Sequence, residues 1–137
     1  MKLSKTSEYA LRILSFMAKD KSRLYTAKYL VETLNISDKY LRRLMTILSK
    51  KGFIYSVQGR EGGYLFAKEL ENIYLIDIIQ SIEGVKKFFG CVLGFEHCSG
   101  ENPCVLHFSL LKMREDFINT FSNKTLSDID FCDVRKF

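Results

Sequence analysis

Apolar residues recur at helical spacing in three stretches of the N-terminal half, and this spacing predicts three helices. The expected helices span Leu3–Lys19, Ala27–Leu34 and Asp38–Lys51. Ser4 or Ser7 can cap the first helix, Thr26 the second and Ser37 the third. Asn35 supplies the turn between the second and third helices. Two short helices joined by a tight turn are typical of a helix-turn-helix unit.

The third predicted helix has a buried stripe and a polar outer face. The stripe consists of Leu41, Leu44, Ile47 and Leu48. Gly52 comes just after Lys50 and Lys51, where a helix end favours glycine and cations. Two β-like runs follow, Phe53–Val57 and Tyr64–Ala67, and the segment between them contains Gly59, Gly62 and Gly63. These runs predict a hairpin whose glycines permit positive φ at its tip.

The C-terminal part changes character after the hairpin. Residues 75–82 predict a short, heavily buried helix that ends at Gly84, and residues 85–104 have no periodic pattern. Helical spacing returns over Val105–Phe121, and Thr125 with Asp128 forms a capping box. We therefore expect a mainly α fold with a small β-hairpin. Its expected parts are a winged helix-turn-helix domain over residues 1–84 and a second part over 85–137.

Charge divides the 137-residue chain in the same way. Residues 1–70 contain 14 Lys and Arg against 6 Asp and Glu, whereas residues 71–137 contain 7 against 10. A basic N-terminal half favours a polyanion as partner. No apolar run approaches the length that spans a bilayer, and Glu8 and Arg12 interrupt the first apolar stretch, so we expect neither membrane insertion nor a signal peptide. The expected location is the cytoplasm, where cysteines stay reduced.

The basic half places its candidate DNA-binding residues on two elements. Those on the third helix and its cap are Ser37, Lys39, Tyr40, Arg42 and Arg43, and those on the hairpin are Gln58, Arg60, Gly62 and Gly63. Arginine can bond guanine in the major groove, while hydroxyls and lysines hold phosphates. The outer face of any amphipathic helix is charged, but the combination with a glycine-tipped hairpin in a basic half predicts double-stranded DNA as the partner.

Three cysteines and a histidine form a second candidate site. Cys91, Cys98, Cys104 and His107 have the spacing C-x6-C-x5-C-x2-H, and the cysteines lie in a segment with several glycines and one proline. Thiolates with an imidazole suit either an iron–sulfur cluster or tetrahedral zinc, and the spacing alone leaves both open. His97 is a rival ligand beside Cys98, whereas Cys132 lies outside the group.

The motifs together resemble the Rrf-two family of bacterial transcription regulators, the group of the iron–sulfur regulator IscR and the nitric-oxide regulator NsrR. The resemblance rests on the opening residues 1–5 with 9–11, the stretch 36–41, the wing 59–65 and the three-cysteine loop. It implies a homodimer that pairs through the long helix after the loop. It also implies a 2Fe–2S cluster, or alternatively a 4Fe–4S cluster, held by Cys91, Cys98 and Cys104.

The resemblance offers two fourth ligands. His107 matches the IscR-type pattern, and Glu8 of the partner subunit matches the NsrR-type pattern. Two positions depart from the family: the first cysteine gap is six residues where five is usual, and Gln58 stands where many members have arginine. The expected function is a DNA-binding regulator whose affinity for a pseudo-palindromic promoter depends on the cluster. A zinc-stabilised or thiol-redox regulator is the alternative. No residues form a hydrolytic triad motif, so an enzyme is not expected.

Overall fold

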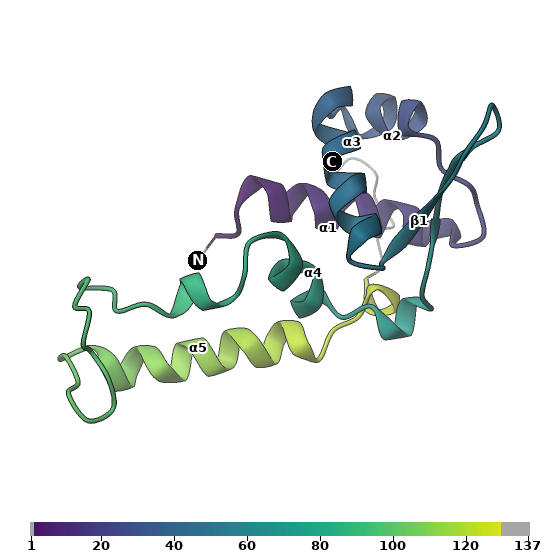
Figure 1. Cartoon of the computed structure of the whole chain (residues 1–137). Helices are drawn as coiled ribbons and strands as arrows, with labels where there is room; N and C mark the ends of the chain where they lie inside the picture. Colours follow the sequence, from purple (N-terminus) through teal and green to yellow (C-terminus); the bar gives the residue numbers. More distant parts are fainter. Residues whose placement is uncertain (1, 130–137) are drawn as a thin grey trace.

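The computed structural model describes residues 2–129 and is mostly helical, with one two-stranded antiparallel sheet. The helices are α1 (Lys5–Met17), α2 (Ala27–Leu34), α3 (Asp38–Lys50), α4 (Leu75–Ile82) and α5 (His107–Ser122), and the strands are β1 (Ile54–Val57) and β2 (Gly63–Phe66). Short 3-10 turns lie at Ala18–Asp20, Leu70–Asn72, Lys86–Phe89 and Leu126–Asp128. Figure 1 shows the hairpin at one end of the molecule and the loop that precedes α5 at the other. The predicted fold class is confirmed.

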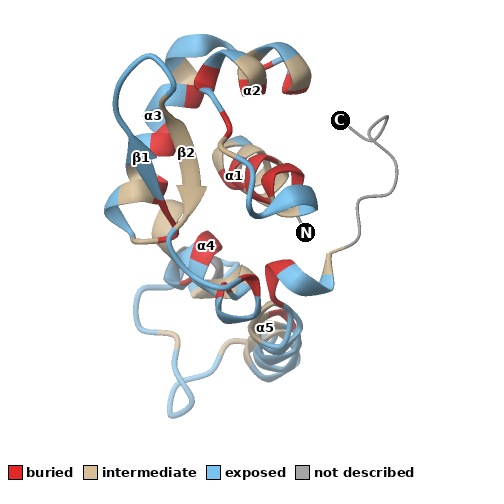
Figure 2. Ribbon diagram, turned by 90° about the vertical axis from the view of Figure 1, so that its right-hand side faces the viewer, coloured by how far each residue is buried: buried red, intermediate tan, exposed pale blue. Residues whose placement is uncertain are grey.

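Helices α1, α2 and α3 enclose the main core. Ser4, Thr26 and Ser37 cap them as predicted, each accepting a bond from a backbone N–H in the first turn. Asn35 adopts the left-handed conformation (φ 53°) that the turn between α2 and α3 requires. Figure 2 shows the buried residues gathered where the three helices face one another. The first helix is shorter than predicted, because the chain tightens into a 3-10 turn at Ala18.

The two strands of the hairpin pair with each other, and the start of the second strand also pairs with the segment between α1 and α2. Ile54 pairs with Phe66 and Val57 with Gly63. Gly63 has no positive φ; instead, a Cβ at this residue would lie 2.6 Å from the carbonyl oxygen of Tyr25. The backbones of Tyr25 and Tyr64 exchange two hydrogen bonds beside it, at 2.8 and 3.1 Å. Glycine is therefore required here by close backbone approach, and Gly59 alone in this hairpin has the positive φ predicted for the tip.

Helix α5 packs against α4 and α1 and is otherwise open. Ile79, Val85 and Phe117 form a small buried cluster with Leu3 and Leu11 against it. Just after the C-terminal end of α5, a β-bridge joins Thr125 to Tyr74, the residue before α4. The predicted capping box of Thr125 and Asp128 is present. Figure 2 shows that most of α5 is exposed.

The start of α5 differs from the prediction. The helix begins at His107 rather than Val105, so Cys104 lies in the turn before it. The His107 N–H donates to the Cys104 carbonyl at 3.1 Å, and Val105 is 88% exposed. Val105 is therefore apolar but exposed, and its hydrophobicity wrongly suggested a buried position in the helix. Within residues 2–129, no helix combines the length and apolarity needed to cross a bilayer.

Candidate metal centre and nucleic-acid interface

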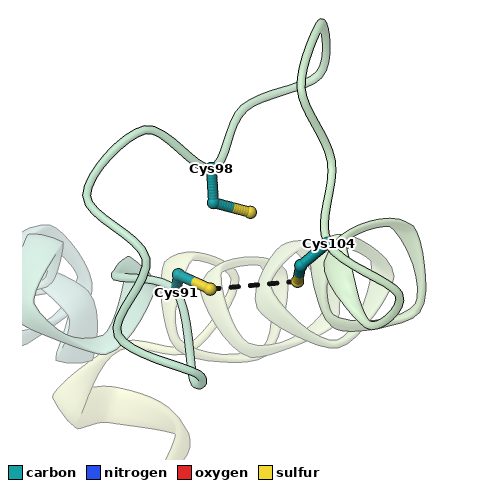
Figure 3. A group of neighbouring side chains, drawn as sticks. All are labelled: Cys91, Cys98 and Cys104. Carbon is teal, nitrogen blue, oxygen red and sulfur yellow. Dashed lines mark hydrogen bonds between the residues drawn. The ribbon is translucent and has the colours of Figure 1, made fainter.

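The three predicted cysteine ligands converge at the N-terminal end of α5. The sulfur atoms of Cys91, Cys98 and Cys104 all lie within 4.8 Å of one another. Cys91 Sγ donates to Cys104 Sγ at 3.8 Å (Figure 3). All three side chains are half-buried, so they are neither sealed in the core nor free on the surface. A compact triangle of thiols is the donor set that soft metals and iron–sulfur clusters prefer.

His107 lies beside this group and contacts Cys98, but it does not belong to the set of ligand atoms within 4.8 Å of one another. Its Nδ1 lies 3.4 Å from Cys98 Sγ, and its ring stacks edge-on against Phe108. His97 is exposed, and its carbonyl oxygen accepts a bond from the side chain of Asn102 at 3.3 Å. His107 is therefore better placed than His97 to complete a four-ligand set.

The thiols of Cys91 and Cys98 differ in pKa. Hydrogen bonds from the N–H of Phe95, and to a smaller extent from that of Leu93, lower the pKa of Cys91 to about 7 against the opposing effect of partial burial. A bond from the Cys104 N–H likewise lowers the pKa of Cys98. Burial and the neighbouring thiols of Cys104 and Cys91 outweigh that bond and raise the pKa of Cys98. Cys91 is therefore the more readily ionised of the two thiols.

Arg114, on the third turn of α5, anchors the start of the cysteine loop. Its Nη2 donates to the Gly90 carbonyl oxygen at 2.8 Å, one residue before Cys91. The sequence offered no signal for this contact, because a single arginine on an amphipathic helix is ordinarily a surface residue. The bond fixes Cys91 relative to the helix that carries His107.

Glu8 lies in the first turn of α1, apart from the cysteines of its own chain. Its carboxylate pairs with Lys5 Nζ at 3.1 Å, and this bond lowers the pKa of Glu8. Cys132 lies outside the described residues.

The polar face of α3 is divided between two grooves. Arg42 lines a groove with Lys28 of α2 and Arg60 of the hairpin, and its Nε is paired with Asp38 at 3.0 Å. Arg43 lines a different hollow, with Ser4 of α1 and Glu83 at the end of α4. The two neighbouring arginines therefore face different parts of the molecule. Arg42 lies on the side of α3 that faces the hairpin.

The other predicted DNA-binding residues have mixed surroundings. Lys39 and Arg60 are exposed, and Gln58 is bonded to Ser56 at 3.1 Å. Ser37 is occupied as the cap of α3. Tyr40 is half-buried, and its hydroxyl donates to Thr6 Oγ1 of α1 at 2.8 Å.

Gly62, the second glycine of the hairpin segment, is required by the fold of the hairpin itself. A Cβ at this position would collide with the Val57 carbonyl oxygen. Gly62, Gly63, Ser37 and Tyr40 therefore each have a structural role in addition to the DNA contact predicted for them.

The first turn of α1 contacts both α3 and the C-terminal end of α4. Thr6 accepts the Tyr40 hydroxyl, and Tyr9 packs edge-on against the Tyr40 ring at 5.5 Å between centroids. Ser7, which follows Thr6 in the sequence, is fully buried and donates to Glu83 Oε1 at 2.6 Å. Sequence reasoning treated Ser7 only as a possible cap and missed Glu83.

A helix-turn-helix with a hairpin wing and a basic groove between them defines a winged-helix DNA-binding regulator. Residues 3–130 match the model of the Rrf2 family, described as iron-dependent transcriptional regulator. The chain belongs to this family, whose members are transcription regulators and not enzymes.

The similar proteins include the regulators NsrR and IscR and the cysteine regulator CymR. NsrR of Bacillus licheniformis is 30% identical over 131 residues, which cover 94% of this chain and 92% of that protein. The structure of T. potens IscR matches with TM-score 0.75 and 25% identity over 93% of this chain and 85% of that one. CymR, the global cysteine regulator of B. subtilis, matches with TM-score 0.76 and 27% identity over 93% and 95%.

Proposed function

We propose that this chain is a homodimeric, cytoplasmic transcription regulator whose affinity for a pseudo-palindromic promoter site depends on an iron–sulfur cluster. The observation that carries the proposal is the triangle of Cys91, Cys98 and Cys104 sulfurs within 4.8 Å, with His107 Nδ1 3.4 Å from Cys98 Sγ. The proposed ligands are these four residues, with Glu8 of the partner subunit as the alternative to His107. A 2Fe–2S cluster is favoured over a 4Fe–4S cluster.

The donor set fits such a cluster chemically. Three soft thiolates and one imidazole suit iron–sulfur centres, and the NsrR and IscR relatives support the assignment. A bound cluster would supply a redox- and nitric-oxide-reactive centre. A ligand set with one member that is not a thiolate is easier to displace or oxidise, which suits sensing of redox state, nitric oxide or cluster supply.

This chain's own residues provide a route from the loop to the DNA-binding face. Cluster binding would order residues 90–107, which follow α4 after the 3-10 turn at Lys86–Phe89, and Glu83 at the end of α4 is bonded to Ser7 on α1. The same turn of α1 holds the Tyr40 hydroxyl on α3 through Thr6. We infer that movement of the loop shifts α1 and thereby α3 and the hairpin, biasing two arrangements of the DNA-binding surface.

The proposed dimer pairs through α5. Phe108 is 61% exposed and Met113 57% exposed, and Leu111 is also open, so this helix has apolar side chains that a second copy would cover. Two recognition helices related by a two-fold axis would contact half-sites about 34 Å apart. At each half-site, Arg42, Arg43, Lys39 and Arg60 are the proposed contacts to bases and phosphates.

A regulator without a cluster is the second candidate. The CymR relatives support it, since one of them is a cysteine regulator and another, from Staphylococcus aureus, has been crystallised in an oxidized form. The chain would then act through its thiols directly or through zinc.

Anaerobic isolation followed by metal analysis, absorption and Mössbauer spectroscopy separates the two candidates. The proposal predicts a coloured protein with iron and sulfide and the Mössbauer signature of a cluster. Colourless protein with stoichiometric zinc, or with no metal after anaerobic reconstitution, would overturn the cluster.

A further inference from the structure

The sulfurs of all three loop cysteines lie within 4.8 Å of one another, and those of Cys91 and Cys104 share a hydrogen bond. Cys91 and Cys104 are in direct contact, with 3.8 Å between their sulfurs. Figure 3 shows these two side chains pointing toward one another from opposite ends of the loop. A disulfide has an S–S length of about 2.05 Å, so the two sulfurs need to move only about 1.8 Å closer.

Cys98 is held differently. Its sulfur lies 3.4 Å from His107 Nδ1. It also sits beside a hydrogen-bonded turn, in which Ser99 and Asn102 exchange two backbone bonds at 3.1 and 3.2 Å. Asn102 closes this turn further through its side-chain bond to the His97 carbonyl. The backbone of Cys98 is itself bonded, since its N–H donates to the Phe95 carbonyl oxygen at 3.4 Å.

The two thiols of the close pair lie at the same end of α5. Cys104 is in the turn before the helix, and the residue before Cys91 is bonded to the helix through Arg114 Nη2 and the Gly90 carbonyl oxygen at 2.8 Å. Cys104 of the pair lines a pocket with Cys98, Phe95 and Pro103, and the Cys91 side chain is half-buried. A small oxidant can therefore reach the pair.

We propose that the cluster-free chain is a peroxide-sensitive dithiol in which Cys91 and Cys104 form a specific disulfide while Cys98 stays free beside His107. One thiol attacks hydrogen peroxide, giving a sulfenic acid and one water. The second thiol attacks that sulfur, the S–S bond forms, and a second water leaves. The two thiols lose two electrons, peroxide is reduced to two waters, and both thiol protons end in water.

The disulfide would act as a reversible block on the metal site. It removes two of the three thiolates, leaving Cys98 and His107, which are too few to hold a cluster or a tetrahedral zinc ion. This consequence rests on the proposed function, whereas formation of the disulfide does not. A dithiol reductant would restore the site, so oxidation of the cluster-free chain would delay its reloading until reducing conditions return.

Peptide mapping of the full cluster-free chain tests the pairing. Cleavage after glutamate puts each loop cysteine on its own peptide: Gly84–Glu96, His97–Glu101 and Asn102–Glu115, with Cys132 on a fourth. After treatment with hydrogen peroxide and alkylation, we expect the first and third peptides to be linked. Peptide His97–Glu101 and the Cys132 peptide should carry the alkyl group, and free thiols should fall from four to two per chain.

Matched variants and a gel complete the test. Cys98→Ser should keep the link, whereas Cys104→Ser should lose it, and the linked chain should run as a single chain on a non-reducing gel. A link to the Cys98 or Cys132 peptide, a covalent dimer, or oxidation to sulfinic acid without any link would overturn the proposal. If the reduced chain also fails to take up iron and sulfide, the cluster proposal fails while the disulfide result stands on its own.

Discussion

Ser7 and Glu83, which are 76 residues apart in the sequence, are joined by a hydrogen bond of 2.6 Å from Ser7 Oγ to Glu83 Oε1. The same carboxylate oxygen accepts the backbone N–H of Ser4 at 3.3 Å. Glu83 caps the C-terminal end of α4, and the 3-10 turn at Lys86–Phe89 lies between it and the cysteine loop. The first turn of α1 is therefore fixed to the end of the helix that precedes the candidate sensing loop.

Removing this bond should destabilise the fold. Ser7→Ala deletes the donor of a part-buried hydrogen bond made by a fully buried hydroxyl, and we expect the free energy of unfolding to fall by about 1–3 kcal/mol. Urea unfolding of the cluster-free chain measures this. Ser22→Ala is the matched control, because Ser22 is exposed and its hydroxyl donates to nearby Asp20, so its effect should stay within about 0.5 kcal/mol. Equal losses in both variants would refute the structural role of the Ser7–Glu83 bond.

Arg42 and Arg43 should contribute unequally to DNA binding. Arg42 faces the groove shared with Lys28 and Arg60, whereas Arg43 faces the hollow beside Glu83. Arg42→Ala should weaken binding to a random-sequence 30-bp duplex by about tenfold at low salt and reduce the salt slope by about 1. Fluorescence anisotropy at several salt concentrations measures both quantities.

Arg43→Ala is the paired comparison for that experiment. We expect this substitution to weaken DNA binding less, because Arg43 lines the hollow beside Glu83 and not the groove next to the hairpin. If Arg43→Ala lowers the slope more than Arg42→Ala does, the duplex approaches α3 from the other side, and the proposed docking geometry is wrong.

The fourth ligand can be assigned by two single substitutions. His107 Nδ1 lies beside Cys98 Sγ, whereas Glu8 is paired with Lys5 within its own chain. We therefore expect His107→Ala to speed the loss of the cluster by roughly tenfold or more, as measured by absorption decay under anaerobic conditions. Glu8→Ala should change the rate far less. An unchanged spectrum and decay for His107→Ala, with loss in Glu8→Ala, would reverse the assignment.

The apolar face of α5 should decide the oligomeric state. Phe108 and Leu111 are exposed and one turn apart, and replacing both by glutamate puts charge into the proposed dimer contact. Sedimentation should then show a monomer, with weaker binding to duplex DNA. Asn119→Glu is the control, since Asn119 is exposed near the other end of the same helix. A dimer that survives the double substitution would exclude pairing through this part of α5.

The sequence predicted the local features of the fold well because these features depend on neighbouring residues. Ser37, Asn35 and the helix over residues 38–50 follow rules of capping, turn conformation and apolar spacing, and each was confirmed. Convergence of the three cysteines was also predicted, because a short irregular loop limits how far apart they can lie.

Long-range contacts were beyond the reach of these rules. Nothing local distinguishes Ser7 from another serine in a helix, and its partner Glu83 is known only once α1 and α4 pack together. Gly63 illustrates the same limit, since its requirement comes from the backbone of Tyr25 in a distant segment. The late start of α5 was missed because a helix leaves the N–H groups of its first turn unpaired, so apolar spacing does not fix the first residue.

The most direct test of the central claim is a comparison of DNA affinity with and without the cluster on one preparation. A duplex selected from a random-sequence pool by the anaerobically loaded protein is titrated with that protein, and again after the cluster has been removed by a chelator. The account predicts that the dissociation constant rises at least about tenfold on removal, equivalent to about 1.4 kcal/mol of coupling between the loop and the DNA-binding surface. Equal dissociation constants for the two forms would contradict control of DNA binding by the cluster.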